Sequence, residues 1–520
     1  MSTAATSRKF STCVPPATFC VAPADVPGLR DAISKLARLH YSENFVQQRL
    51  GLDDLGDLHW RSLPIFRAER LAIRDPLALA IDLFLLQGTI PANELDLLFS
   101  ATDRDVLIRA GLLAIDESGL VGARASLFPV GDRLIFSDHA WPQLPHPGHA
   151  AVPYDQVMSV GLDSRGLARC TVRRPYRTAL DICTGSGIHA LLAAAHTQQV
   201  LAVDISPRAA RCAAFNAQAA GASNLEVIVG DLFEPVRGAS FDLITANPPF
   251  VPSPLDTLCF RDGGPSGEDI QKRIVAGLPH HLAPGGIAQM VTELGERDDE
   301  PFAHRLRQWL NGAAMDIHIL RLGEHTAMKY AVGHAQGDHY QAFLDSADQW
   351  AGNLRAQGYL RVVSLIISFR WSDPQFGPPW DRVDECPPPR RPAGAEIDAA
   401  FLAERLSRHS ACPQLLRNSC VRRAGPIALL DARLLGSDTR ARAKATRMGQ
   451  ALLIEHQLNP LERELLYRIE GCISVPDLLK TFCDLPAYEL AVIEALRSLL
   501  RRQLLHIDVG AASLPQAAGL

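Results

Sequence analysis

The chain has 520 residues, 47% of them hydrophobic and 21% charged, and a formal net charge of −5. This length exceeds what one hydrophobic core supports, so we expect about two to four domains. The negative net charge excludes a positive potential over the whole protein that would attract nucleic acid. Nucleic acid could therefore bind only at a local basic patch. The 11 cysteines include no C-x-x-C pair and no zinc-finger spacing, so we predict no metal site and reduced thiols. No apolar run reaches membrane-spanning length, and we expect a cytoplasmic protein.

The N-terminal quarter of the chain predicts a short disordered segment and then a helical domain. Residues 1–25 are rich in Ser, Thr, Ala and Pro, which is typical of disorder. Over residues 26–150, the periodicity predicts helices at 28–50, 76–86, 92–99 and 103–110, followed by short extended segments at 112–115, 119–123 and 132–136. This pattern resembles a winged-helix module, which would present a helix to a groove. The acidic residues at 80–118 favour instead a lid that shapes the substrate site or mediates dimerisation.

Strands and helices alternate regularly in the middle of the chain. Short apolar strands are predicted at 178–182, 200–203, 225–229 and 241–246, with helices between them, and this alternation predicts a parallel sheet. A chemically distinctive segment follows or ends each strand. These segments are the glycine-rich turn at 183–187, the acid Asp204, the acid Asp231 and the run Asn247, Pro248, Pro249 and Phe250. In such sheets ligands bind at the carboxyl ends of the strands, where all four segments fall.

The glycine-rich turn and the second-strand acid predict an adenosine-type ligand. Gly185 and Gly187 carry no side chain, so a ligand can approach the backbone at a helix N-terminus. Asp204 can accept hydrogen bonds from both hydroxyls of a ribose. The third glycine of the dinucleotide fingerprint is missing, because Ile188, His189 and Ala190 follow the turn. An adenosine that carries a small group without phosphate therefore fits better than NAD.

These motifs resemble the class I S-adenosylmethionine-dependent methyltransferases. Within them, Asn247 to Phe250 resembles the branch that includes the HemK/PrmC-type protein glutamine methyltransferases and the small-domain rRNA N-methyltransferases. The resemblance covers about residues 155–370 and implies an α/β fold with a Rossmann-like seven-stranded sheet and S-adenosyl-L-methionine as cofactor. The cofactor-binding residues that it implies are Asp181, Cys183, Thr184, Gly185, Ser186, Gly187, Asp204, Ile205, Asp231, Leu232 and Asn247. Asp231 would accept from the adenine amino group, and Leu232 departs from the aromatic residue common in relatives.

The Asn-Pro-Pro-Phe segment, which comprises Asn247, Pro248, Pro249 and Phe250, is the predicted catalytic element. The lone pair of a planar amide or aromatic –NH2 group is delocalised. Two acceptors, the Asn247 side-chain oxygen and the Pro248 carbonyl, can each take one N–H and direct that lone pair at the methyl group. Both prolines fix φ, which pre-organises the acceptors. Phe250 offers a ring face to a flat substrate.

Three more strands, at 287–294, 315–320 and 360–369, complete the predicted seven-stranded sheet. The insertion before the last strand, with a helix at 340–356, is expected either to cover the active site with Tyr330, Trp350 and His325 or to pack on the N-terminal domain. In the segment after Phe250, the charged residues either contact the substrate or cap the next helix. These charged residues are Arg261, Asp262, Glu268 and Asp269.

The predicted domains are the N-terminal domain at 26–150, the catalytic domain at 151–370, a proline-rich linker at 371–395 and a C-terminal domain at 396–520. The linker is expected to be extended because of its prolines. The C-terminal domain predicts helices at 460–469, 475–482 and 487–502 and a strand at 504–509. This pattern is again winged-helix-like, and we expect it to bind a partner or substrate.

The favoured function is a methyltransferase that acts on a nitrogen of a small molecule or peptide, because the acidic balance argues against bulk RNA. Methylation of an RNA base or of a protein glutamine is the first alternative. A regulatory protein that only senses S-adenosylmethionine is the second, although a sensor has no need of the acceptor pair. O- or C-methylation would need a general base, and none is identifiable. A homodimer is compatible with the sequence.

Overall fold

The computed structural model describes residues 18–139, 154–432, 442–482 and 486–508. The predicted disordered segment lies mostly outside this part of the chain. The chain divides into two compact units. The first comprises Met1–Ala168, Arg174–Trp309 and Thr326–Val362, and the second comprises Arg169–Arg173, Leu310–His325 and Val363–Leu520.

The N-terminal part of the first unit is helical and carries two small β structures. The single helix predicted at 28–50 is two helices, α1 (Val26–Arg38) and α2 (Glu43–Leu50), because His40 between them adopts a left-handed φ of 63°. The other elements are α3 (Leu63–Ile65), α4 (Pro76–Ala80), the 3-10 helix η6 (Glu94–Leu97), α5 (Ala101–Arg109), β1 (Thr89–Pro91), β2 (Leu113–Ile115), β3 (Leu120–Ala123), β4 (Ser126–Val130) and β5 (Arg133–Ser137). Strands β1, β3 and β2 form one antiparallel sheet, and β4 pairs with β5. The winged-helix assignment stays a prediction.

Some acidic residues of the N-terminal part form ion pairs inside the fold. The buried carboxylate of Asp82 accepts from Arg67 Nε at 2.8 Å and from Arg74 Nη1 at 3.0 Å. Buried charges of this kind are stable when they are paired. Some of the acids are therefore part of the folded N-terminal structure and not of a surface field.

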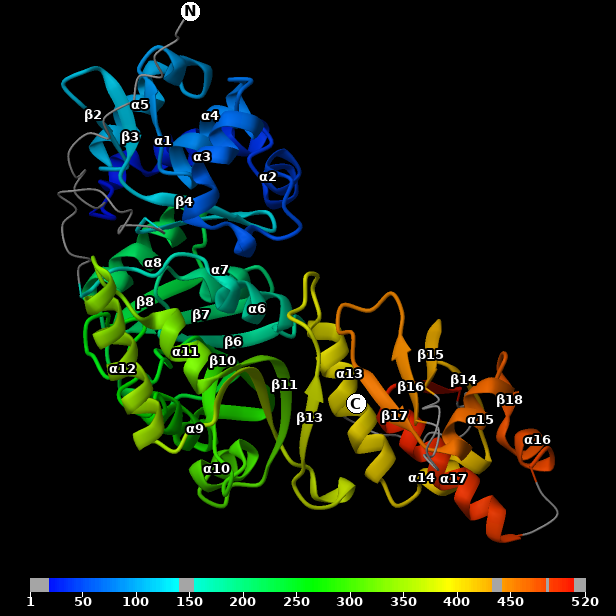
Figure 1. Cartoon of the computed structure of the whole chain (residues 1–520). Coiled ribbons are helices and arrows are strands. Elements are labelled where there is room, and N and C mark those ends of the chain that lie inside the picture. The colour runs from blue at the N-terminus through cyan, green and yellow to red at the C-terminus, as the bar shows by residue number, and fades with distance from the viewer. Residues whose placement is uncertain (1–17, 140–153, 433–441, 483–485, 509–520) are drawn as a thin grey trace, which may run out of the picture. The chain divides into compact units, whose positions relative to one another are not determined.

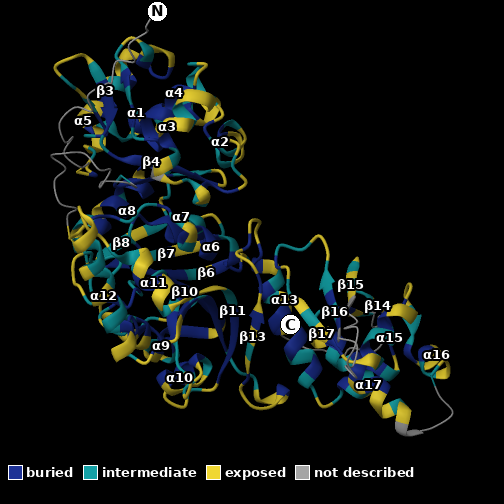
Figure 2. Ribbon diagram, in the orientation of Figure 1, coloured by how far each residue is buried: buried dark blue, intermediate teal, exposed yellow. Residues whose placement is uncertain are grey.

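Five parallel strands form the centre of the first unit, in the order β10-β9-β6-β7-β8. They are β6 (Tyr176–Ile182), β7 (Thr197–Asp204), β8 (Leu225–Val229), β9 (Phe241–Ala246) and β10 (Leu282–Glu296). The inner strands β6 and β9 are almost continuously buried, as expected for strands covered on both faces. Helices α7 (Ile188–Ala194) and α8 (Pro207–Ala220) lie between this sheet and the N-terminal part, and α9 (Asp269–His281) and α10 (Phe302–Trp309) lie on its other side (Figure 1). Figure 2 shows buried residues along the central strands and exposed residues on the outer helices.

The second unit contains three further strands in the order β13-β11-β12. Strands β11 (Met315–Thr326) and β12 (Arg361–Trp371) complete the seven predicted strands, so the α/β prediction is confirmed. The segment 371–395 is not simply an extended linker, because β13 (Asp381–Glu385) pairs in parallel with β11 and the neighbouring Trp380 is buried. The register runs from Ile317↔Asp381 to Arg321↔Glu385.

The C-terminal part of the second unit combines five helices with two small sheets. These elements are α13 (Gly394–Arg408), α14 (Cys412–Arg417), α15 (Pro460–Arg468), α16 (Val475–Lys480), α17 (Pro486–Arg501), β14 (Cys420–Arg423), β15 (Ile427–Ala432), β16 (Arg442–Arg447), β17 (Glu455–Leu458), β18 (Ile473–Ser474) and β19 (Leu505–Asp508). The three predicted helices and the final strand correspond to α15, α16, α17 and β19. The sheets have the orders β18-β14-β19 and β15-β16-β17.

One hydrophobic core joins the N-terminal part of the first unit to helices α7 and α8. Leu127 and Phe136 belong to the same buried cluster as Ile188 and Phe215. At its centre the fully buried amide of Asn216 accepts from the Phe136 backbone N at 2.9 Å and donates to the Phe136 carbonyl at 2.7 Å. The same nitrogen donates to the carbonyl of Ser186 at 2.8 Å. The N-terminal β structure is thereby hydrogen-bonded, through one side chain, to the turn that follows β6.

Within the described residues, no helix combines the length and the apolar character that crossing a membrane requires.

Candidate active site

The four distinctive segments of the sequence meet at one edge of the central sheet. Strands β7, β6 and β9 are adjacent and parallel, and β8 follows β7. Their carboxyl ends therefore lie side by side. The glycine turn (Cys183–Gly187) follows β6, Asp204 ends β7, Asp231 follows β8 and Asn247 follows β9. The predicted site residues are thus brought together by the sheet order.

The glycine turn has the backbone that its sequence predicts. Cys183, Gly185 and Gly187 all have positive φ, of 56°, 55° and 79°. A Cβ on Gly185 would meet no atom within 4 Å, so this position is open to a ligand. A Cβ on Gly187 would lie 3.0 Å from the Cβ of Ala213 on α8, so Gly187 permits close helix packing. Burial raises the pKa of the Cys183 thiol well above its ordinary value, which agrees with a purely backbone role.

The carboxylate of Asp181 holds the glycine turn in place through hydrogen bonds. Its carboxylate accepts from Thr184 Oγ1 at 2.5 Å, from Thr245 Oγ1 at 2.7 Å and from the Ala190 backbone N at 3.2 Å. The side chain is only 1% exposed, and burial raises its pKa to about 6 despite these donors. Asp181 therefore links the turn to two strands and to the start of α7.

Asp204 lies directly against the turn. Its carboxylate accepts from the Gly185 backbone N at 2.8 Å and from the Ser206 backbone N at 2.9 Å. Burial raises its pKa above 3.8, although these backbone donors act in the opposite direction. A carboxylate has about four acceptor sites, so both oxygens can still accept hydroxyl donors.

The remaining predicted cofactor-binding residues, Ile205, Asp231 and Leu232, lie just after β7 and β8. Ile205 is 61% exposed, which is unusual for a large apolar side chain and provides an apolar surface beside Asp204. Leu232 is buried and adopts a left-handed φ of 49°. Asp231 accepts from Arg273 Nη2 on α9 at 2.6 Å. No sequence motif predicts this pairing, which places a cation next to the predicted acceptor of the adenine amino group.

The side-chain amide of Asn247 is oriented by α6 (Leu162–Cys170). Asn247 Nδ2 donates to Asp163 Oδ2 and to Ser164 Oγ, both at 3.2 Å. The carboxylate acceptor assigns the nitrogen to this side of the amide, and the oxygen Oδ1 consequently faces away from α6. Burial raises the pKa of Asp163. Sequence reasoning did not identify Asp163 or Ser164, because they precede Asn247 by more than eighty residues and form no motif with it.

The segment after Asn247 folds back onto the backbone of Pro249 and Phe250. A Cβ on Gly263 would lie 2.9 Å from the Pro249 carbonyl oxygen. Gly267, with φ of 71°, would place a Cβ 2.4 Å from the Phe250 carbonyl oxygen. The return of the segment 251–267 therefore contacts the predicted catalytic residues directly, and only glycine fits at these two positions.

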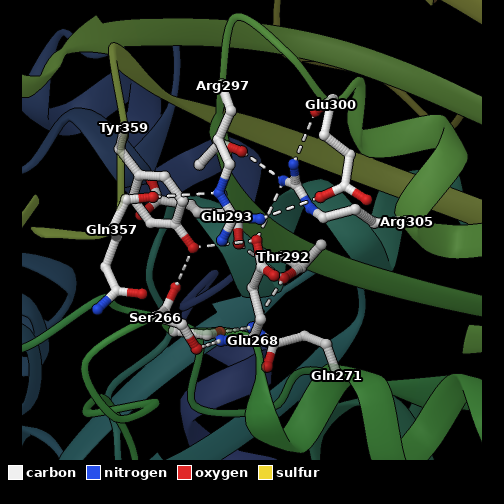
Figure 3. A network of polar contacts seen from close by, with 12 residues as sticks. Ser266, Glu268, Gln271, Thr292, Glu293, Arg297, Glu300, Arg305, Gln357 and Tyr359 are labelled. Atoms are coloured by element: carbon white, nitrogen blue, oxygen red, sulfur yellow. Dashed lines mark hydrogen bonds and ion pairs between the residues drawn. The ribbon is translucent and has the colours of Figure 1, made fainter.

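A polar network fixes that return segment (Figure 3). The hydroxyl of Tyr359 lies 2.8 Å from the Ser266 carbonyl, to which it donates, and 3.1 Å from Glu268 Oε1. Arg305 Nη2 lies 3.0 Å from Glu268 Oε1, and both side chains of this ion pair are largely buried. Breaking a buried pair costs more than breaking an exposed one, so the network gives the segment a defined position. Glu268, predicted to contact substrate or to cap α9, is thus a structural residue.

The insertion consists of α11 (Ala327–His334) and α12 (Tyr340–Ala356) and packs beside Phe250. Tyr330 and Trp350 form a buried cluster with Val251, against which Phe250 packs. Asn353 Nδ2 donates to the carbonyls of Pro252 at 3.1 Å and Pro265 at 2.9 Å. The insertion therefore covers the segment 251–267, and Tyr330 and Trp350 are part of its core.

The backbone of Arg261 and Asp262 pairs with Val251, directly after Phe250, and their side chains pair with each other. Asp262 accepts from Arg261 Nε at 2.7 Å and from the backbone N of Thr257 at 2.8 Å, so this pair stabilises the segment internally. His325 is exposed. In the part of the chain that the structure describes, no group of His, Cys, Asp or Glu side chains forms a candidate metal site.

The site fits an adenosine-type cofactor. Open space lies above Gly185, a carboxylate lies beside it, and the exposed side chain of Ile205 adjoins that carboxylate. These groups match a methionine-like chain, a ribose and a flat base in turn.

Comparison with known proteins adds two family matches. A family model described as "Methyltransferase small domain" matches residues 160–308. A second model, described as a domain of unknown function (DUF7059), matches residues 39–125. The first match contains the central sheet and the candidate site, and the second covers the helical N-terminal part.

Three relatives illustrate the similarity. The ribosomal protein uL3 glutamine methyltransferase of Bradyrhizobium diazoefficiens is 38% identical over 148 residues, which cover 25% of this chain and 46% of the relative. The release factor glutamine methyltransferase of Geobacter sulfurreducens is 38% identical over 140 residues, 24% of this chain and 49% of the relative. A Methanocaldococcus jannaschii protein, provisionally named a protein N5-glutamine methyltransferase, is 32% identical over 145 residues, 26% of this chain and 73% of the relative. The chain spans about half the length of the first two relatives.

Proposed function

The chain belongs to the HemK/PrmC-like branch of the class I S-adenosylmethionine-dependent methyltransferases, and we propose that it methylates the side-chain amide nitrogen of a glutamine in a protein. Membership rests on the match over the catalytic sheet and on the relative of which 73% is covered. The activity and the substrate class are inferred from the site and from the names of the relatives.

The chain's own residues would bind the cofactor at the carboxyl edge of the sheet. When bound, S-adenosylmethionine supplies an electrophilic methyl group. The glycine turn would lie along the methionine part, Asp204 would accept the ribose hydroxyls, and Ile205 would contact the base. Asp181 keeps the turn in place through Thr184 and Ala190.

The orientation of Asn247 carries the proposal. Its nitrogen donates to Asp163 and Ser164, so its oxygen is available to accept one N–H of a substrate amide. The Pro248 carbonyl would accept the other N–H. With both hydrogens fixed in a plane, the nitrogen lone pair can be aligned with the methyl group, and alignment supplies much of the rate enhancement.

A protein glutamine replaces the small molecule or peptide that the sequence favoured. The relatives are named for glutamine in ribosomal protein uL3 or in release factors, and this supports the alternative that the sequence analysis kept open. A glutamine amide is planar and presents two N–H donors, which matches the two acceptors of the site.

The test is methyl transfer from labelled S-adenosylmethionine to uL3 and to a release factor, each with its target glutamine intact or replaced by asparagine. We expect label on the intact protein only, and a rate lower by roughly a hundredfold but still measurable with the enzyme variant Asn247→Ala. The affinity of this variant for the cofactor should stay within about threefold, because the acceptor pair contacts substrate. An undiminished rate of transfer in Asn247→Ala, or label on RNA in place of protein, would overturn the proposal. Calorimetry with S-adenosylmethionine and S-adenosylhomocysteine shows separately whether the cofactor site is intact.

A further inference from the structure

The second unit contains a cleft that is not part of the candidate active site. It is small and partly open to solvent, and it is lined by residues from β11, β13, α13, β16, the loop before β17, β17 and the turn after α17. The charged and titratable residues of its wall are His318, Arg382, Glu396, Arg447, His456 and Arg502. Three guanidinium groups therefore face one cleft that carries a single carboxylate in its lining.

Among the described residues, Arg447 is the cation of this wall that forms no direct ion pair with a carboxylate. Within the described residues, its guanidinium donates to Gln503 Oε1 at 3.3 Å, and its Nε is buried without an acceptor. Burial lowers the pKa of Arg447, against the opposing effect of Glu396 in the same wall. A buried donor without an acceptor calls for an explanation, and a bound ion is one of the possible ones.

The other charges of the wall are paired and keep donors for a ligand. Arg382 Nε lies 2.8 Å from Asp384, and Arg502 Nη1 lies 3.1 Å from Glu462. Arg382 Nη1 also donates to the Arg501 carbonyl and Arg502 Nη1 to the Gln457 carbonyl, both at 2.7 Å. Each guanidinium has five N–H donors, so these contacts still leave donors unused. The carboxylate of Glu396 accepts from the backbone N of Ala451 and of Leu452, both at 2.8 Å, and is therefore engaged by the loop before β17.

Two histidines, His318 and His456, also line the cleft. His318 Nε2 lies 2.8 Å from Asp384 Oδ2, and its Nδ1 is buried without a partner. Burial, together with Arg382, Arg502 and Arg447, lowers the pKa of His456 to about 4, against the opposing effect of Asp384. His456 is thus neutral near pH 7, because burial and the nearby guanidinium groups together outweigh the carboxylate of Asp384.

We propose that this cleft is a phosphate-binding site, in which Arg447, assisted by Arg382 and Arg502, binds the phosphate group of a nucleotide or of an RNA strand. Arginine forks match the geometry of phosphate oxygens and bind them with two parallel hydrogen bonds. The phosphate neutralises the unpaired charge of Arg447 and accepts from its buried Nε. This site is independent of the methyl-transfer site, so its test does not depend on the proposed function.

The test is calorimetric titration of the full chain, saturated with S-adenosylhomocysteine to block the cofactor site, with inorganic phosphate, AMP and a short single-stranded RNA. We expect saturable binding that weakens at least about tenfold in Arg447→Gln and by a smaller factor in Arg447→Lys, which keeps the charge without the fork. The matched control is Lys444→Gln on the same strand, whose exposed side chain pairs with Glu455 at 2.7 Å. Binding tighter for AMP than for phosphate would assign a nucleotide, and binding tightest for RNA would assign its backbone.

Two results would overturn the proposal. One is the absence of binding by all three probes in the wild-type chain. The other is binding that Arg447→Gln and Arg447→Lys leave unchanged, or that Lys444→Gln weakens equally. Unchanged affinity for S-adenosylhomocysteine and an unchanged circular dichroism spectrum show that each variant is folded.

Discussion

Replacing Asp163 by alanine should slow methyl transfer without weakening cofactor binding. Asp163 and Ser164 each accept from Asn247 Nδ2 at 3.2 Å, so Asp163→Ala removes one of two acceptors that orient the amide. A hydrogen bond to a charged group contributes about 1.5–3 kcal/mol, and a neutral one about 0.5–1.5 kcal/mol. Burial raises the pKa of Asp163 and so disfavours its charged form. We therefore use the energy at which the two ranges meet, about 1.5 kcal/mol. If this energy fixes the acceptor geometry in the transition state, kcat falls about tenfold.

The assay is a double-mutant cycle on kcat with the labelled-methyl transfer described above. Asp163→Ala should lose about tenfold in the wild-type chain and almost nothing in an Asn247→Ala background, because the residue acts through Asn247. Asp163→Asn keeps an acceptor oxygen and should stay within about threefold of wild type. Asp31→Ala, at an exposed position of α1, is the control. Equal losses in both backgrounds, or a matching loss of cofactor affinity, would refute the reasoning.

Three further predictions address the cofactor site, the polar network around Tyr359, and the hydrogen bonds of Asn216 that connect the N-terminal part to the turn after β6. Burial raises the pKa of Asp204, and the ribose needs the ionised form, so adenosine affinity should weaken as the pH falls toward that raised pKa. Calorimetry should show this decline at a higher pH than an ordinary aspartate would give, and Asp204→Asn should remove the contribution of this group. Tyr359→Phe should raise the activation free energy of methyl transfer by about 1 kcal/mol, which lowers kcat roughly fivefold, and should leave cofactor affinity unchanged. A change in cofactor affinity alone would contradict the role of the network. Asn216→Ala should cost about 3 kcal/mol in urea unfolding, since it leaves buried backbone groups of Phe136 and Ser186 without partners, and a loss below about 1 kcal/mol would contradict this.

The central sheet could be predicted because its signals are local. Each strand is a short apolar run with a turn residue or an acid at its end, and parallel pairing then places those ends at one edge. Gly185, Asp204 and Asn247 were identified in this way, and the structure brings them together. The β13 strand was missed because the prolines around it are typical of a linker, whereas its pairing with β11 is a tertiary contact.

The residues that orient the site could not be predicted, because they lie far from it in the sequence. Asp163 precedes Asn247 on a separate helix, and Arg273 reaches Asp231 from α9. Tyr359 reaches Ser266 across the whole insertion. None of these pairs has a characteristic spacing, and only the tertiary packing of α6, α9 and the residues after α12 brings them into contact. Sequence pattern thus identifies groups that are placed at strand ends, and it misses groups whose role is to hold others in position.

The hydrogen bonds of Asn216 set a lower limit on the smallest portion of this chain that can fold. Its amide joins β5 to the carbonyl of Ser186, and Leu127 and Phe136 share a core with α7 and α8. A chain cut before residue 155, which keeps all of the region matched as a methyltransferase small domain, would expose that core to water and leave Asn216 without its Phe136 partners. The segments matched separately at 39–125 and 160–308 therefore share one hydrophobic core, and we expect a fragment that begins at residue 155 to be less stable than the same segment within the whole chain.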